Sequence, residues 1–483
     1  MSEFTLEHLV QGASGRLRVQ DAAQKESLLA LPLGKVVTHS GEVTRGDVFW
    51  ALVGERHDGA DFAAEAISRG AAGIVARSGS VVPPPGGWVV EVDDPQSALW
   101  RLARWQRARL SARVIAVTGS AGKTTTRQMI AAALSGVLRG TASPRNFNNH
   151  VGLPLSLLSA SPQDDFAVFE LGASAAGEIG RLAALCRPDI AVIASAGDAH
   201  LQGFGSREAI AAAKAEILEA LPEDGWAVLA GDDPQLRRAA AGHGRRTIWF
   251  GRSADCDACP EHVAHHDGLL SFVLDGSRFE VPVWGRHHLG AALAAVAVAR
   301  IFELDDDEIA AGLRQFRPLR GRCSVVRRND VTVIDDSYNA SPAAMQAALD
   351  LLGQFPTTGK RIAVCGEMAE LGDAAGALHR TAGRDVVRRA AADVMVSCGE
   401  HRDEYARGAR DAGMPGDSVL KFESSGDVAA AIEGVVAPGD VVLVKGSRAG
   451  RMEQVVTALS GKAPAGSAPL RTATMTPASM QVT

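Results

Sequence analysis

The sequence predicts an α/β protein with three domains: a small α/β domain, a central ATPase-like domain with a parallel sheet and a P-loop, and a C-terminal Rossmann-like domain. Three observations carry this prediction. The length of 483 residues suits two to four domains. From Arg113, and again from about Arg317, short β-branched runs alternate with helical patterns. In the first of these series, a glycine-rich loop joins a strand to a helix.

Composition narrows the class of protein. Hydrophobic residues make up 46% and charged residues 22%, as in globular proteins. The net charge of -6 argues against a broad nucleic-acid surface, and the six cysteines are scattered, which fits a reducing cytosol. The start lacks a signal-peptide pattern, and the longest apolar run, Leu289–Ala299, is too short to span a bilayer. We therefore expect a cytoplasmic protein without nucleic-acid binding or membrane insertion.

The first domain is expected at residues 1–94. It contains an apolar run over Asp47–Val53, a helical pattern near Phe62–Gly70 and a second apolar run over Ala72–Ala76. An amphipathic segment, Gln96–Leu110, leads into the next domain.

The two larger domains are expected at residues 95–316 and 317–463, and each has a helix-covered parallel sheet. The expected strands of the first are Val114–Val117, Phe166–Phe169 and Ile190–Ile193. Those of the second are Val331–Ile334, Ile362–Val364, Val394–Val396 and Val441–Val444. Residues 464–483, which are rich in Ala, Thr, Ser, Pro and Met, are expected to form a disordered tail.

The strongest functional signal follows the Val114–Val117 strand. A phosphate loop is predicted there, formed by Gly119, Ser120, Ala121, Gly122, Lys123, Thr124 and Thr125. Glycines let backbone N–H groups surround phosphate oxygens, Lys123 can bridge the β- and γ-phosphates, and a threonine hydroxyl can bind Mg²⁺. Val117 stands at the first glycine of the usual P-loop spacing, so the loop is short. The alternative is a glycine-rich turn without a ligand.

Three further residues are expected near this loop. Glu170 closes one strand and His200 follows another, and the carboxyl ends of parallel strands meet at one edge of a sheet. Both are therefore candidate Mg²⁺ ligands, although each also fits an ordinary strand end or loop. Lys214 lies in an alanine-rich helix that Ser206 can cap, and an exposed helical face is an equally good interpretation from sequence alone.

The C-terminal domain offers two more groups at strand ends. Asp335–Pro342 brings carboxylates, Tyr338 and Asn339, which suit ribose, base or phosphate. Lys445–Arg448 brings two cations and a hydroxyl, which suit an anionic ligand. Each segment also fits a surface turn.

Two histidine or cysteine patterns are not expected to bind metal. Cys256 and Cys259 form a single C-x-x-C motif near His262, His265 and His266, without a second cysteine pair. The pair His287–His288 is not a metal motif either.

The chain resembles the Mur ligase family up to about residue 460. The matching motifs are G-D-V-F-W-A-L-V-G-E-R-H-D-G at 46–59, T-G-S-A-G-K-T-T at 118–125, N-F-N-N-H-V-G-L-P at 146–154, E-L-G-A-S-A-A-G-E-I at 170–179, A-H-L-Q-G-F-G-S at 199–206, A-K-A-E-I at 213–217, D-D-S-Y-N-A-S-P at 335–342, G-E-M-A-E-L-G at 366–372 and V-K-G-S-R at 444–448.

The resemblance is strongest to members that join D-alanyl-D-alanine to UDP-N-acetylmuramoyl-tripeptide in peptidoglycan synthesis, with ATP and Mg²⁺, two ions being expected. It implies a monomer whose first domain binds the UDP substrate. Lys123 and Thr124 then hold phosphate and Mg²⁺, Glu170 and His200 bind metal, and Lys214 is carbamylated to N6-carboxylysine as a further metal ligand. It makes Lys123, His200 and Lys214 the catalytic set, and Arg322, Asp336 and Asn339 nucleotide contacts.

Several positions depart from the family pattern. Ser195, Ala230, His288, Ala291 and Ser341 occupy positions where the family usually has asparagine. Arg145 replaces a glycine that is usual in the family, and Gly41 replaces a usual arginine. His288 and Ala291 belong to the adenine motif, so base recognition is open. Two alternatives also stay open: another Mur-type amino-acid ligase, and a nucleotide-binding ATPase without ligase activity.

Overall fold

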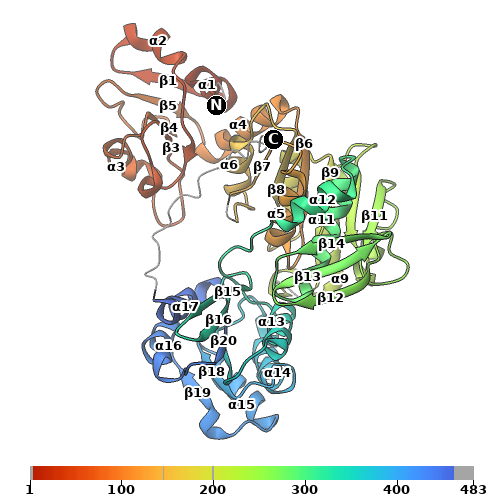
Figure 1. Cartoon of the computed structure of the whole chain (residues 1–483). Coiled ribbons are helices and arrows are strands. Elements are labelled where there is room, and N and C mark those ends of the chain that lie inside the picture. Colours follow the sequence, from red (N-terminus) through yellow and green to blue (C-terminus); the bar gives the residue numbers. More distant parts are fainter. Residues whose placement is uncertain (1–3, 145, 198–200, 462–483) are drawn as a thin grey trace, which may run out of the picture.

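The computed structural model describes residues 4–144, 146–197 and 201–461, with the side chains of Leu201 and Gln202 left out. Three large sheets follow one another along the chain and form three α/β units (Figure 1). The first unit lies beside the second through α4, and the third lies below both in that view.

The first unit holds a five-stranded sheet in the order β1-β5-β4-β3-β2, in which only the β1–β5 pairing is antiparallel. Its elements are α1 (Leu6–Ala13), β1 (Arg16–Val19), α2 (Lys25–Leu29), β2 (Val36–Val37), β3 (Val48–Trp50), α3 (Ala63–Ser68), β4 (Gly73–Arg77) and β5 (Trp88–Val92). Helix α4 (Pro95–Arg109) buries Leu99 and Leu102 against this sheet with α1 and continues into the second unit. One helix thus belongs to both cores.

The second unit is built on a parallel six-stranded sheet in the order β11-β10-β9-β6-β8-β7. Its strands are β6 (Arg113–Thr118), β7 (Gly140–Ala142), β8 (Phe166–Glu170), β9 (Ile190–Ile193), β10 (Trp226–Ala230) and β11 (Arg246–Phe250). Its helices are α5 (Lys123–Leu134), α6 (Gly152–Ser159), α7 (Glu178–Cys186), α8 (Leu201–Phe204), α9 (Arg207–Ala215), α10 (Pro234–Ala239), α11 (Leu289–Ile301) and α12 (Asp306–Arg314).

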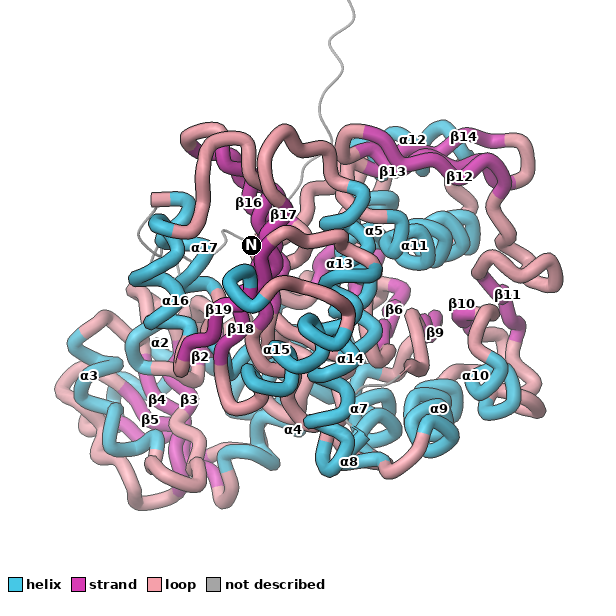
Figure 2. Tube along the Cα trace, turned by 90° about the horizontal axis from the view of Figure 1, so that it is seen from below, coloured by secondary structure: helices cyan, strands magenta, loops and turns pink. Residues whose placement is uncertain are grey.

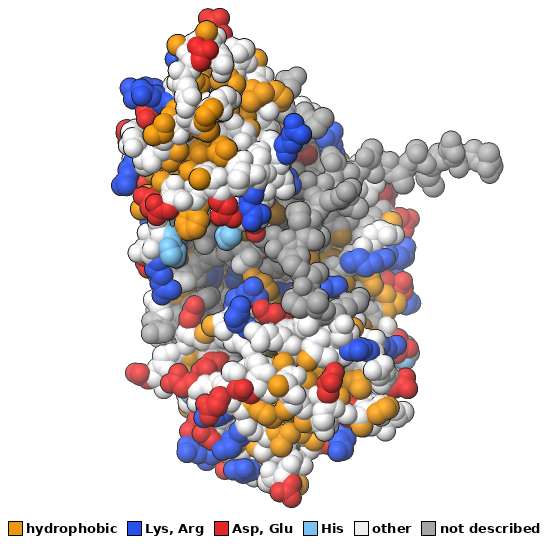
Figure 3. Space-filling view, turned by 90° about the vertical axis from the view of Figure 1, so that its left-hand side faces the viewer, with side chains coloured by type: hydrophobic (Ala, Val, Ile, Leu, Met, Phe, Trp, Pro, Cys, Tyr) orange, Lys and Arg blue, Asp and Glu red, His pale blue; other side chains and the backbone are white. Residues whose placement is uncertain are grey.

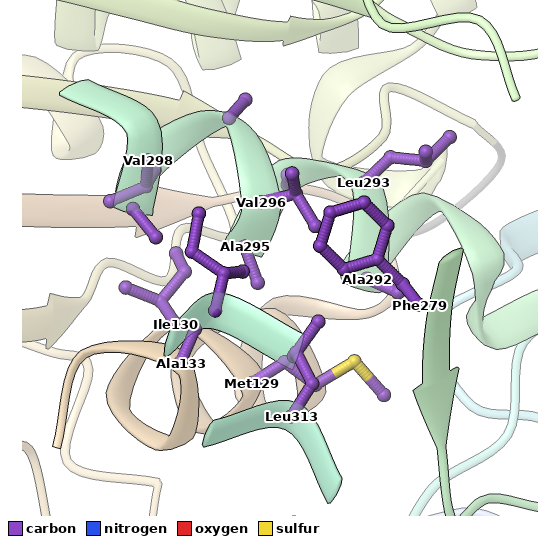
Figure 4. Packing of buried hydrophobic residues seen from close by; sticks show 14 of the residues in the cluster. Met129, Ile130, Ala133, Phe279, Ala292, Leu293, Ala295, Val296, Val298 and Leu313 are labelled. Atoms are coloured by element: carbon purple, nitrogen blue, oxygen red, sulfur yellow. The ribbon is translucent and has the colours of Figure 1, made fainter. Parts of the chain in front are cut away.

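Helices α5, α11 and α12 cover one face of this sheet. Small residues of α11, such as Ala292 and Ala295, let it approach Met129 and Ile130 of α5 (Figure 4). A three-stranded antiparallel sheet, β12 (Glu261–His266), β13 (Leu269–Leu274) and β14 (Ser277–Val281), packs Phe279 into the same core. The core under the phosphate loop is therefore rigid and closely packed.

The third unit has the strand order β15-β16-β20-β17-β18-β19, and only β15 runs antiparallel to its neighbour. Its strands are β15 (Ser324–Arg328), β16 (Val331–Asp336), β17 (Arg361–Cys365), β18 (Val394–Cys398), β19 (Val419–Phe422) and β20 (Val441–Lys445). Helices α13 (Pro342–Gln354), α14 (Ala375–Arg388) and α15 (Arg402–Asp411) cover one face, and α16 (Ser425–Ala431) and α17 (Glu453–Ser460) cover the other (Figure 2).

The predicted fold class is confirmed, and each strand expected in the two larger units is present within two residues. The β12–β14 sheet was not predicted. On the face drawn in Figure 3, acidic and basic side chains of the described residues are interspersed. In the described part of the chain, no helix combines the length and the apolar character needed to cross a bilayer. The expected tail lies outside the described residues.

Candidate functional site

The loop that is expected to bind phosphate joins the end of β6 to the start of α5, so the predicted order of strand, loop and helix is present. Gly119 and Gly122 have φ values of +149° and +79°, which residues other than glycine rarely adopt. Ser195, which follows β9, binds the backbone of this loop with two hydrogen bonds. Its backbone oxygen accepts from Ser120 N at 3.0 Å, and its hydroxyl oxygen accepts from Ala121 N at 2.9 Å. The replaced asparagine position therefore has a structural role in this chain.

Lys123 is the first residue of α5, and its Nζ donates to Gly119 O at 2.7 Å. The amine thus folds back over the mouth of the loop. Desolvation lowers the pKa of Lys123, and the nearby Arg322 lowers it further, while Glu170 opposes the shift. Lys123 and Arg322 together give the loop a positive electrostatic potential, which favours the binding of a polyanion.

Glu170 ends β8 and is almost fully buried, with 1% of its surface exposed. Its carboxylate accepts from Thr124 Oγ1 and from Asn148 Nδ2, both at 2.9 Å, and Arg127 Nε lies 3.6 Å from Oε2. Sequence reasoning did not single out Arg127. Arg127 lies one helical turn after Lys123 on α5 and therefore on the same helix face, which could have indicated that it lies near the site. Glu170 is thereby fixed beside the phosphate loop.

Lys214 is buried, with 1% of its surface exposed, which excludes the exposed-face interpretation. It lies near the end of α9, which Ser206 caps by accepting from Ala209 N at 3.1 Å. Its Nζ lies 5.3 Å from the ring centroid of Phe204. Burial, with the charge of Lys123 nearby, lowers the pKa of Lys214 to about 7. A large share of the amine is therefore neutral near neutral pH.

His200 lies outside the described residues, and so does Arg145. Of the three expected metal ligands that follow the phosphate loop, the structure therefore describes Glu170 and Lys214. Glu170 is bonded to Thr124, the neighbour of Lys123 on α5, and the charge of Lys123 contributes to the lowered pKa of Lys214.

A cavity of about 670 Å³ lies next to the phosphate loop. It is bounded by the ends of β9, β10 and β11 and by the start of α11, and its lining includes Ser195, Asp232, Arg286, His287 and Leu293. The altered adenine motif therefore does face a cavity of nucleoside size. Burial lowers the pKa of His288, also in that motif, well below its usual value, so this ring is neutral.

The third unit presents Arg322 and Tyr338 toward the phosphate loop. The Arg322 guanidinium lies 4.2 Å from the Tyr338 ring centroid, and Arg448 lies 5.6 Å from it. The two units are in contact near this point, since Cys323 Sγ lies 3.6 Å from His287 Nε2. The charge of Arg322 contributes to the lowered pKa of Lys123.

Two C-terminal groups differ from what the sequence suggested. Lys445 is buried and does not face an external anion, because its Nζ donates to the Asp336 carboxylate and, at 3.0 Å, to Asn339 O. Asp335, likewise buried, accepts from Gly321 N and Ser337. Parallel pairing of β16 with β20 brings Asp336 directly beside Lys445. Asn339 is exposed, and so is Arg448.

A second cavity, of about 660 Å³, lies between α4, α7 and the loop before α6. Arg101, Arg104 and Arg181 line it together with Asn149 and His150. Arg181 lies 5.8 Å from the Trp100 ring centroid. Three guanidinium groups and one carboxylate, that of Glu178, line this concave surface, and the excess of positive charge suits an anionic ligand.

Comparison with known proteins gives concordant matches. Residues 117–299 match the Mur ligase middle domain, and residues 321–448 match the Mur ligase, glutamate ligase domain. Two relatives are named UDP-N-acetylmuramoyl-tripeptide--D-alanyl-D-alanine ligase. The Bacillus subtilis protein is 35% identical to this chain, and the match covers 87% of this chain and 92% of the relative. The Escherichia coli protein is 34% identical, and the match covers 95% of this chain and 99% of the relative.

Solved structures agree with these matches. MurF from Acinetobacter baumannii superposes with a TM-score of 0.81 at 28% identity and covers 95% of this chain and 99% of its own. MurF ligase from Thermotoga maritima in complex with ADP gives a TM-score of 0.73 at 33% identity. The match covers 88% of this chain and 97% of that structure's chain.

Proposed function

Because this chain belongs to the Mur ligase family of ATP-dependent ligases, we propose that it joins D-alanyl-D-alanine to the terminal carboxylate of UDP-N-acetylmuramoyl-tripeptide, a cytoplasmic step of peptidoglycan precursor synthesis. The observation that carries the proposal is one site: a glycine-rich phosphate loop with Lys123, a fixed Glu170 and a nucleoside-sized cavity beside them. Relatives with the same activity in their names match over nearly the whole chain.

The phosphate loop and the neighbouring cavity together accommodate ATP. Backbone N–H groups at the start of α5 and the Lys123 amine bind the phosphates, and the cavity before α11 takes the base. Arg322, which faces the loop from the third unit, adds positive charge next to the γ-phosphate. Asp336 is paired with Lys445, so we assign it to shaping this face of the cleft.

The residues present fit the two Mg²⁺ ions that this family implies. Thr124 donates its hydroxyl proton to Glu170, which leaves the lone pairs of its oxygen free, and oxygen ligands are those Mg²⁺ prefers. Thr124, Glu170 and a carbamylated Lys214 would hold the ions, with His200 as a further candidate. When bound, Mg²⁺ neutralises charge on the phosphates and on the transferring group.

Carbamylation of Lys214 is supported by its environment. The reaction needs an uncharged amine, and the lowered pKa of Lys214, about 7, provides one. The carbamate converts a buried cation into an anion with two oxygen donors. A buried ammonium between Lys123 and a magnesium site would be electrostatically unfavourable, and the modification removes that conflict.

The chemistry then follows in two steps. The tripeptide carboxylate attacks the γ-phosphorus of ATP, the bond to the β-phosphate oxygen breaks, and ADP and an acyl phosphate form. The amine of D-alanyl-D-alanine attacks the acyl carbon and loses a proton, and inorganic phosphate leaves with the electrons of the broken C–O bond. Lys123 and Arg322 stabilise the charge on the transferring phosphoryl group, and contact between the second and third units excludes water that would hydrolyse the acyl phosphate.

The UDP-linked substrate is strongly anionic, and the arginine-lined cavity beside α4 supports its binding between the first and second units. Arg101 and Arg104 come from α4, which both units share, and Arg181 comes from α7. We assign this cavity to an anionic part of the substrate.

The proposal is tested by phosphate release from ATP with the acceptors varied. Release is expected only when UDP-N-acetylmuramoyl-tripeptide and D-alanyl-D-alanine are both present. Substituting D-glutamate or a diamino acid for the dipeptide tests the other Mur-type ligases and should give background rates. Release that needs neither acceptor would identify a plain ATPase and overturn the proposal.

A further inference from the structure

Three metal-ligating side chains meet at the junction of the second and third units. His287 and His288 precede α11, and Cys323 precedes β15. One ligand atom from each lies within 4.8 Å of the others, although His287 and Cys323 are 36 positions apart in sequence. The sequence analysis did not expect the His287–His288 pair to bind metal, and no local pattern connects Cys323 with it.

The geometry of this cluster suits a tetrahedral metal ion. Cys323 Sγ lies 3.6 Å from His287 Nε2. A zinc ion with Zn–S of about 2.3 Å and Zn–N of about 2.0 Å separates two tetrahedral ligands by about 3.5 Å. The separation observed is thus already that of two ligands on one ion. A thiol donating to an imidazole gives a similar distance, so the test must distinguish a bound ion from this hydrogen bond.

The surroundings allow an ion to enter and be retained. His288 and Cys323 are buried, whereas His287 is exposed and lines the nucleoside-sized cavity, which gives an entry path. The neutral state of the His288 ring is the one that binds metal. Three protein ligands leave a fourth position for water.

We propose that His287, His288 and Cys323 bind a thiophilic divalent cation such as Zn²⁺, which joins the second unit to the third across the base cavity. Thiolate and imidazole ligands select zinc over Mg²⁺, so the ion is distinct from those used with ATP. On binding, the Cys323 thiol loses its proton to solvent and the thiolate coordinates the metal. Since His287 also lines the cavity, ion and nucleotide compete, and the site acts as an inhibitory metal switch.

Co²⁺ is the probe, because a cobalt–thiolate bond gives a charge-transfer absorption that oxygen ligands do not give. The full chain, freed of metal by a chelator, is titrated with Co²⁺ in excess Mg²⁺. We expect one charge-transfer band that saturates at one Co²⁺ per chain and disappears when Zn²⁺ is added. Saturating ATP should raise the Co²⁺ concentration needed at least about tenfold. A chain without the band at saturating Co²⁺ overturns the proposal.

Variants assign the ligands. Cys323→Ser should lose the band, and His288→Asn, which restores the family's residue, should keep a folded chain yet weaken Co²⁺ binding about 10- to 100-fold. Cys259→Ser is the matched control, because this cysteine lies outside the cluster and is partly exposed. A band that persists in Cys323→Ser, or that vanishes in Cys259→Ser, contradicts the assignment. No peptide substrate is used, so this result is independent of the proposed ligase activity.

Discussion

Among single residues, Lys123 is the one on which the proposed phosphoryl transfer depends most. Its amine is held over the phosphate loop by a 2.7 Å bond to Gly119 O, so removing it leaves the loop backbone in place. We expect Lys123→Ala to fold normally and to lose about 10²–10³ in turnover. Lys25→Ala, at an exposed position of α2, is the control and should keep full activity. Near-normal turnover of folded Lys123→Ala would contradict the role.

Lys214 gives a prediction in which stability and activity move in opposite directions. Because the folded pKa of about 7 lies below the usual 10.5, the unfolded chain binds more protons, and the amine destabilises the fold most below pH 7. In CO₂-free buffer at pH 6, Lys214→Met should raise the free energy of unfolding by about 1 kcal/mol or more. The gain should shrink as the pH rises from 7 to 10.5.

The same substitution should abolish ligation in the presence of bicarbonate, since methionine cannot be carbamylated. A stabilised and fully active Lys214→Met enzyme would exclude the carbamate. Urea denaturation at several pH values and the phosphate-release assay provide the two measurements.

Local sequence signals identified some of these residues and not others. Lys123 and Glu170 follow from the strand–loop–helix order, which is a local property. The burial of Lys214 depends on Phe204 and on packing of α9 that no local pattern shows. The pairing of Asp336 with Lys445 joins residues 109 positions apart and follows from the strand order β16-β20, which the sequence does not reveal.

At the scale of elements, the site depends on how closely α12 packs against α5, the helix that begins at Lys123. A Cβ on Gly312 of α12 would lie 2.5 Å from Ala132 O of α5, a clash with backbone that cannot turn away. Gly312→Ala should therefore lower the free energy of unfolding by about 1–3 kcal/mol.

Gly136→Ala is the matched control, because nothing lies within 4 Å of the added carbon there and the change should stay within about 0.5 kcal/mol. Equal stability of the two variants would show that α5 and α12 are not held at this distance. Chemical denaturation of both variants provides the measurement.

Element positions were predictable where the pattern was strong, as in the seven strands expected in the two larger units and in α4 and α5. The β12–β14 sheet was not predicted. Its first strand, Glu261–His266, is polar and largely exposed. Its middle strand, Leu269–Leu274, does carry an apolar pattern, which the sequence analysis did not use. The inward residue Phe279 of this sheet is buried only through contact with the core of α5 and α11.

For the whole molecule, we propose that the third unit completes the ATP site with Arg322, whose charge contributes to the lowered pKa of Lys123. A guanidinium that binds phosphate through charge-assisted hydrogen bonds contributes about 1.5–3 kcal/mol. We expect Arg322→Ala to lower kcat/KM for ATP about 10- to 100-fold. Arg320→Ala, two residues earlier and exposed, should be close to neutral. Equal kinetics for the two variants would place Arg322 outside the reaction.

In the proposed reaction, the phosphoryl group passes from ATP to the substrate carboxylate before the amide bond forms. The direct measurement uses UDP-N-acetylmuramoyl-tripeptide labelled with ¹⁸O in its terminal carboxylate, and the released phosphate is analysed by mass spectrometry. When the amine attacks the acyl phosphate, inorganic phosphate leaves with one of the two carboxylate oxygens. With both oxygens labelled, one ¹⁸O is therefore expected in the phosphate for each carboxylate turned over. Phosphate free of ¹⁸O, formed together with the amide product, would contradict the proposed reaction.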